Sequence, residues 1–176
     1  MNRIAPIVAF STTLILLAGC NKASSEQPVE TETTTSAETQ PHAWILTSAP
    51  EGAVSILEAK ANAAEGDQIV IKGRIGGRHS PVSADSPVFT IVDLELVYCG
   101  QHSDEGCVTP WDYCCEKPET IASNSATVQI VGFDSIDPLA AGLEPLDEVV
   151  IIGTVGQRPD DVVLTIQATG VYPSDG

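Results

Sequence analysis

The chain has 176 residues, of which 24 are acidic and 8 are basic, so its formal net charge is −16. From His42 onward there are 20 acidic and 6 basic residues. Because nucleic acid is bound largely through Lys and Arg contacts to phosphates, this excess of acidic residues disfavours general DNA or RNA binding.

A secretory signal is predicted at the amino terminus. Arg3 provides a positive start, residues 4–17 form an apolar run, and small residues precede Cys20. The run is shorter than the ~20 residues that a membrane-spanning helix needs, and it contains Pro6. A cleaved signal is therefore favoured over a retained transmembrane anchor.

The segment Leu17-Ala18-Gly19-Cys20 closely resembles the lipobox of bacterial lipoproteins. The resemblance implies that residues 1–19 are a signal peptide, that Cys20 carries a diacylglyceryl thioether, and that its amino group is acylated, with palmitate as an expected acyl chain. Several acyl chains hold a protein on a membrane far better than one. The expected location is the cell envelope, facing the periplasm or the exterior. The residue after Cys20 is Asn21 and not Asp, and in bacterial lipoproteins this favours sorting to the outer membrane.

Residues 20–41 are expected to form a disordered acidic tether. They are rich in Ser, Thr, Glu and Ala, and Val29 is the one large apolar residue among them. Such a segment cannot bury enough surface to offset the entropy of ordering it.

Residues 42–65 are predicted to form an N-terminal segment and a helix. The helix is expected to start near Pro50 and to end at about Ala64, because Pro suits a first helical turn. Val54, Leu57 and Ala61 would share its buried face.

The globular part, residues 66–173, is predicted to be mainly β. The segment 66–75 reappears in altered form at 146–155, and both copies alternate apolar residues around a central glycine, Gly73 or Gly153. These glycines fall where a strongly bent barrel strand would bulge or coil. Three further segments rich in β-branched residues, 88–98, 126–131 and 162–171, bring the expected strands to five, and 136–143 suits a short helical turn.

This pattern resembles the oligonucleotide/oligosaccharide-binding (OB) fold over residues 66–172. The Gly-Asp-x-Val-x-Val-x-Gly type of pattern occurs at the first and fourth strands, and Phe89-Thr90-Ile91-Val92-Asp93 resembles the second strand. The resemblance implies a five-stranded Greek-key barrel with a cysteine-rich loop between strands 2 and 3. Ligands of this fold usually meet the loops after strands 1 and 4, here 76–87 and 156–161.

Four cysteines, Cys99, Cys107, Cys114 and Cys115, lie within 17 residues. In an exported protein they are first interpreted as two disulfides. A bond between adjacent Cys114 and Cys115 would be strained, so each is expected to join Cys99 or Cys107. Both pairings of this kind remain open. The run Cys-x-Thr-Pro-Trp-Asp-Tyr-Cys-Cys resembles a group of bacterial secreted or lipid-anchored proteins that brings no assigned activity.

The alternative for this loop is a metal site. Cysteine thiolates with His102 or His79 would suit zinc or copper(I), since soft sulfur ligands favour both. Against this, the loop lacks the paired Cys-x2-Cys spacing of ordinary zinc sites, and it lacks the Cys-x-x-Cys of thioredoxin-like enzymes. No cofactor is therefore expected in the main interpretation.

Two sets of side chains are candidate ligand-binding residues. Trp111 and Tyr113 would either plug the barrel mouth or form an aromatic contact platform. Basic residues with one histidine would line an anion-binding groove or would merely be solvated; they are Lys72, Arg74, Arg78, His79 and Arg158.

No nucleophile elbow, phosphate loop or His-Glu-x-x-His motif is present in the sequence, so an enzyme is not expected. The prediction is a lipid-anchored, non-catalytic binding or assembly module of the envelope, with a protein or glycan partner. The alternatives are metal binding through the cysteine loop and nucleic-acid binding by the barrel.

Overall fold

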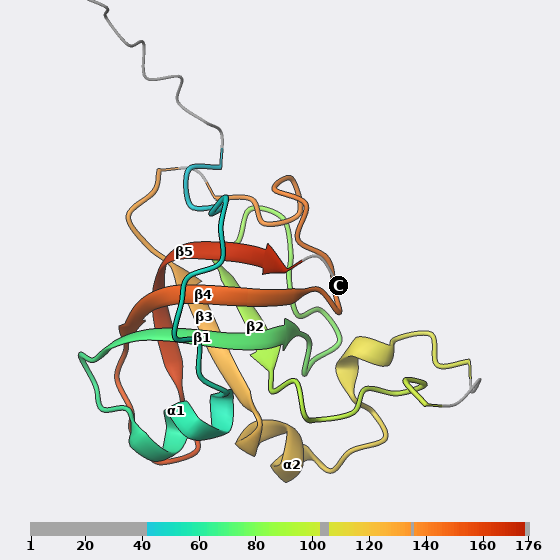
Figure 1. Cartoon of the computed structure of the whole chain (residues 1–176). Coiled ribbons are helices and arrows are strands. Elements are labelled where there is room, and N and C mark those ends of the chain that lie inside the picture. The colour runs from blue at the N-terminus through green and yellow to red at the C-terminus, as the bar shows by residue number, and fades with distance from the viewer. Residues whose placement is uncertain (1–41, 103–105, 135, 175–176) are drawn as a thin grey trace, which may run out of the picture. The chain divides into compact units, whose positions relative to one another are not determined.

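The computed structural model describes residues 42–102, 106–134 and 136–174 (Figure 1). The predicted signal peptide, the predicted lipidation site Cys20 and the predicted acidic tether lie outside these residues. Among the helices in the described ranges, none has the length and apolar character needed to cross a bilayer.

Five strands close into a barrel with the order β1-β2-β3-β5-β4. The parallel pair is β3 and β5, and the other neighbouring strands are antiparallel. A five-stranded Greek-key barrel of this kind defines an OB-like fold, so the predicted fold class is confirmed. The strands are β1 (Gln68–Ile75), β2 (Val88–Val92), β3 (Ser125–Ile130), β4 (Glu148–Val155) and β5 (Thr165–Ser174).

The two sequence repeats become neighbouring strands. β1 pairs with β4 in a register that places Ile71 opposite Ile151, and both side chains are fully buried. The alternation of apolar residues in each repeat is therefore explained by one face of each strand pointing into a shared core. The core also takes Phe89, Ile91, Val128 and Ile166 from the remaining strands.

The repeat glycines permit close packing in two different ways. The register of β4 against β5 shifts between Ile152 and Gly153, which is the expected irregularity, and a Cβ at Gly153 would collide with the Gln167 carbonyl oxygen. At Gly73 the register is unbroken, but a Cβ would lie 3.0 Å from the Val92 carbonyl oxygen. Glycine is needed at both positions because another backbone approaches closely.

The N-terminal segment pairs with the barrel before the first helix starts. Leu46 N donates to Val171 O (2.8 Å), and Val54 exchanges hydrogen bonds with Val70 and Lys72 of β1 (both 3.0 Å). Because residues up to Val54 are used in this way, α1 (Ile56–Asn62) begins later than predicted, after Ser55 caps it by accepting from Glu58 N (3.1 Å).

The helix α1 also buries a different face from the predicted one. Ile56 and Ala59 are buried, whereas Leu57 is 43 % exposed and Ala61 is exposed. The Ile56 side chain reaches into the space above Gly73, so the barrel contact decides which face turns inwards. Figure 1 shows α1 lying across one end of the barrel.

The connection between β2 and β3 differs most from expectation. β2 ends at Val92 instead of Tyr98, because the buried Asp93 carboxylate accepts from Leu57 N (3.2 Å) and Glu95 N (3.1 Å) and turns the chain. An unpredicted helix, α2 (Pro118–Ser123), then leads into β3, and its proline at the first turn is the signal that could have revealed it. The stretch 136–143 holds a hydrogen-bonded turn, with Leu143 N donating to Pro138 O (3.0 Å).

Candidate functional site

The cysteine loop closes on a short 3-10 helix, η1 (Pro110–Asp112). The Asp112 carboxylate accepts from Thr109 Oγ1 (2.8 Å) and from Cys114 N (3.0 Å). These hydrogen bonds lower the pKa of Asp112 although burial opposes them. Tyr113 adopts the left-handed conformation (φ 57°), which reverses the chain and brings Cys114 and Cys115 back towards Cys99.

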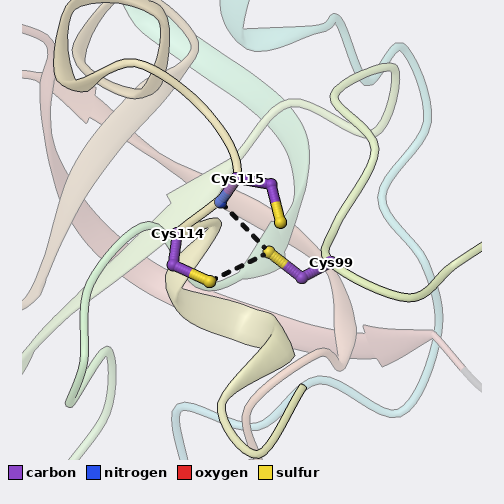
Figure 2. A group of neighbouring side chains, drawn as sticks. All are labelled: Cys99, Cys114 and Cys115. Atoms are coloured by element: carbon purple, nitrogen blue, oxygen red, sulfur yellow. Dashed lines mark hydrogen bonds between the residues drawn. The ribbon is translucent and has the colours of Figure 1, made fainter. Parts of the chain in front are cut away.

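The four thiols form one cluster, three members of which appear in Figure 2. Cys99 Sγ lies 3.4 Å from Cys114 Sγ, and Cys107 Sγ lies 3.7 Å from Cys114 Sγ. The sulfur atoms of Cys99, Cys114 and Cys115 are all within 4.8 Å of one another. No bond joins them in this structure, but the loop has placed residues that are up to 16 positions apart within reach of disulfide formation.

Contacts within the cluster shift the pKa values of Cys99, Cys114 and Cys115 in different directions. Burial opposes ionisation of Cys99, but hydrogen bonds from the Cys115 thiol and backbone N–H (3.3 Å), and from Cys114 and Cys107, lower the pKa of Cys99 overall. Hydrogen bonds to Cys99 and Cys107 raise the pKa of Cys114. Contact with Cys99 and burial raise the pKa of Cys115. Ionisation is therefore favoured at Cys99 and disfavoured at Cys114 and Cys115, and the thiolate is the reactive species.

The predicted metal ligands are only partly brought together. Cys99, Cys114 and Cys115 would supply three sulfur ligands, and Cys107 touches one of them. His102 is exposed and is not part of this three-residue group, and neither is His79. A set of three thiolates suits copper(I) or zinc by its softness.

The two predicted aromatic residues take different roles. Tyr113 is fully buried, and it packs against Gly76 at the end of β1, where a Cβ would lie 2.9 Å from its ring. Trp111 is half-buried, its indole N–H donates to His79 O (2.9 Å), and its own carbonyl accepts from Gly77 N (2.8 Å). Tyr113 thus covers the barrel, and both residues fasten the cysteine loop onto the β1–β2 loop.

Arg74 lies at the centre of this closed end. It is 7 % exposed, it forms an ion pair with Glu148 (2.7 Å), and its guanidinium stands 5.1 Å from the Tyr98 ring centroid. Its Nη1 and the Tyr113 hydroxyl make no complete hydrogen bond to described residues. Burial raises the pKa of Tyr113, while the proximity of the Arg74 guanidinium, as a hydrogen-bond donor and as a charge, opposes this rise.

The other predicted basic residues lie apart from Arg74 or serve the fold. Lys72 is exposed, and Arg78 Nε donates to Thr90 Oγ1 (3.3 Å). Arg158 donates to the carbonyl oxygens of Ala63, Lys60 (2.9 Å) and Asp161 (3.3 Å). With Arg74 paired and Arg158 fastening the β4–β5 loop to α1, the five residues do not form one anion-binding groove.

A groove between α1, the carboxyl end of α2 and the β4–β5 loop was not predicted from residue types. It is a cavity of about 450 Å³ lined by Leu57, Lys60, Ala61, Ser123, Asp161 and Val162. A smaller hollow of about 170 Å³ adjoins it through Val162 and includes Val163. Leu57, Val162 and Val163 are 43 %, 47 % and 39 % exposed. We call this surface the Val162 groove. The sequence pointed to it only indirectly, because ligands of the OB fold were expected near the loop after the fourth strand, residues 156–161.

Lys60 closes one side of the Val162 groove. Its Nζ donates to Ala122 O (2.7 Å) and Ser123 O (3.0 Å), at the carboxyl end of α2. Burial, with a smaller contribution from the nearby Arg158 charge, lowers the pKa of Lys60 to about 8. This end of the groove therefore holds a cation whose charge depends on pH in the weakly alkaline range.

No family model and no curated protein matches the chain. The fold defines the class to which the protein belongs, an OB-like barrel closed at one end by a cysteine loop, and this statement rests on the strand order. Among solved structures, the hypothetical protein YgiW from E. coli is similar at 15 % identity and a TM-score of 0.36, with 72 % of this chain and 96 % of that chain covered. A putative aspartyl-tRNA synthetase from Leishmania major Friedlin is similar at 8 % identity and a TM-score of 0.39; the similarity covers 73 % of this chain and 22 % of the synthetase.

Proposed function

We propose that this protein is a lipid-anchored component of the cell envelope whose OB-like domain binds a protein partner without catalysing a reaction. The lipobox supports the anchor, because it places a modifiable cysteine at the end of a secretory apolar run. The long acidic segment after Cys20 would let the domain reach away from an anionic membrane surface.

The observation that carries the binding role is the Val162 groove. Its aliphatic side chains are exposed next to one another, at the β4–β5 loop where OB folds usually meet ligands. Apolar surface that stays exposed around a concave site is typical of an interaction surface. A protein partner is favoured over a glycan because the groove offers Leu and Val, while Tyr113 is buried and the Trp111 indole is engaged by His79.

The groove is tested by comparing variants in a pull-down from detergent-solubilised envelope. Val162→Asp together with Leu57→Ser should lose a captured protein that the unchanged chain retains. Leu139→Ser is the matched control, since Leu139 is 44 % exposed but does not line the groove. A partner retained equally by the groove variant would place the binding surface elsewhere, and capture of glycan alone would identify the other ligand class.

The anchor is tested separately with Cys20→Ser. We expect the unchanged chain to incorporate labelled palmitate and to fractionate with membranes, and the variant to do neither. Membrane association of an unlabelled Cys20→Ser chain would contradict lipidation at this residue.

Nucleic-acid binding is disfavoured by the net charge. Titration of the purified chain with a single-stranded oligonucleotide should show no binding that weakens steeply with salt. Micromolar affinity with such a salt dependence would overturn the argument from charge.

The second candidate function is metal binding at the cysteine cluster. The observation that favours it is the group of three sulfur atoms within 4.8 Å of one another. A chain purified without reductant should then carry zinc or copper by elemental analysis and should release free thiols when a chelator removes the metal. Absence of both metal and free thiols would exclude this candidate.

A further inference from the structure

We propose that the cysteine cluster is a dithiol oxidation site that forms two disulfides with one connectivity, Cys99–Cys115 and Cys107–Cys114. This inference is independent of the Val162 groove. The sequence leaves two pairings open, and the structure distinguishes them through the position of Cys107.

Cys107 can reach only part of the cluster. Its sulfur lies 3.7 Å from Cys114 Sγ, and this is the one sulfur contact that Cys107 makes among the described side chains. It stands outside the group in which the sulfurs of Cys99, Cys114 and Cys115 all lie within 4.8 Å of one another. Cys114 is therefore the partner that the geometry offers to Cys107.

The shortest single contact does not decide the pairing. Cys99 Sγ and Cys114 Sγ are closest, at 3.4 Å, but a bond between them would leave Cys107 with Cys115. A bond between Cys99 and Cys107 would leave adjacent Cys114 and Cys115, whose ring would be strained. Cys99–Cys115 with Cys107–Cys114 is the connectivity in which both pairs already lie within reach and neither bond joins neighbours.

The chemistry needs an oxidant, and we assign this role to a protein or small-molecule disulfide. The Cys99 thiolate attacks the oxidant disulfide, which releases one oxidant thiolate and leaves a mixed disulfide on Cys99. Cys115 loses its proton and displaces the second oxidant thiolate. Each bond moves two electrons and two protons from a pair of cysteines to one oxidant disulfide, and the same exchange joins Cys107 to Cys114.

The Cys99–Cys115 bond would fix the closed end of the barrel. Cys99 directly follows Tyr98, whose ring contacts Arg74, and Cys115 lies two residues after Tyr113, which packs against Gly76. Cys99 is buried, whereas Cys107 and Cys114 are more accessible. Cys115 is exposed, so the Cys99–Cys115 bond offers one accessible sulfur and the Cys107–Cys114 bond offers two. Cys107–Cys114 is therefore expected to be reduced first, because thiol exchange depends on access to the sulfur.

The test is partial reduction of the oxidised full chain, followed by differential alkylation and tandem mass spectrometry. A first alkylating reagent marks cysteines that open early, and a second reagent marks the rest after full reduction. We expect the first label on Cys107 and Cys114 together, and the second on Cys99 and Cys115. Fragment ions between residues 114 and 115 tell the two neighbours apart.

Two matched double variants control for rearrangement during the experiment. Cys107→Ser with Cys114→Ser leaves the Cys99–Cys115 pair, which lies within reach and should oxidise to a chain without free thiols. Cys99→Ser with Cys114→Ser leaves Cys107 and Cys115, which make no sulfur contact among the described side chains, so this variant should keep free thiols longer under the same oxidant. Joint labelling of Cys107 with Cys115, or four thiols that remain reduced with bound metal, would overturn the proposal.

Discussion

Two neighbouring regions of the molecule, the cysteine loop and the Val162 groove, use side chains in opposite ways. Around the cysteine loop, Tyr113 is fully buried, Arg74 is 7 % exposed, and the thiols are gathered in one cluster. In the Val162 groove, Leu57 and Val162 remain more than two-fifths exposed beside a cavity of about 450 Å³. Arg158 and Lys60 make hydrogen bonds only at the border of this groove.

This contrast shows that chemically conspicuous residues need not form the binding surface. A buried arginine or tyrosine must be paired or packed. Arg74 and Tyr113 therefore contact the rest of the barrel and are not available to a partner. Exposure of Leu and Val side chains to water is unfavourable in free energy. Their exposure in a concave groove is therefore the more informative observation.

The largest expected effect belongs to Tyr113→Ala. Removing a fully buried aromatic ring should lower the free energy of unfolding by about 3–5 kcal/mol, measured by urea denaturation under reducing conditions. Tyr113→Phe is the control and should change it little, because the hydroxyl makes no complete hydrogen bond to described residues. An equal loss in both variants would show that the hydroxyl, and not the ring, secures the closed end.

A smaller effect is expected from a pair of glycine substitutions that compares the packing of the cysteine loop with that of the β4–β5 loop. A Cβ at Gly76 would lie 2.8 Å from Trp111 O and 2.9 Å from the Tyr113 ring, so Gly76→Ala should cost about 1–3 kcal/mol and loosen the cysteine loop. At Gly156, which occupies the corresponding position after β4, the nearest atom would be Thr165 O at 3.4 Å. Gly156→Ala should therefore change stability by less than about 1 kcal/mol. Equal urea midpoints for the two variants would mean that the cysteine loop and the β4–β5 loop pack equally closely against these glycines.

The smallest effect concerns the pH dependence contributed by Lys60. Its pKa is about 8 in the folded chain, below its ordinary value, so between these values the unfolded chain binds more protons. Stability should then rise with pH over this range and lose that contribution as the pH falls through about 8. Relative to Lys60→Met, the unchanged chain should gain about 1 kcal/mol or less from pH 7.5 to 10, because solvent screens a half-buried amine. A flat or falling difference in the unfolding free energies would contradict the depressed pKa.

Much of the barrel was predictable because its signal is local. Alternation in 66–75 and 146–155 indicated two strands with one buried face, and the structure places Ile71 opposite Ile151 in neighbouring β1 and β4. The start and the buried face of α1 were harder to predict, since Val54 is drawn into pairing with β1 and Ile56 fits above Gly73.

The five strands, their inward faces and the concentration of cysteines in one loop can be recognised from local sequence, because alternation and spacing are properties of short segments of chain. The burial of Tyr113 and Arg74, the contact of Cys107 with Cys114, and the meeting of Leu57 and Val162 in one groove depend on how distant segments pack. Burial and contact depend on which distant surfaces pack against each other, and closure of the barrel brings these surfaces together.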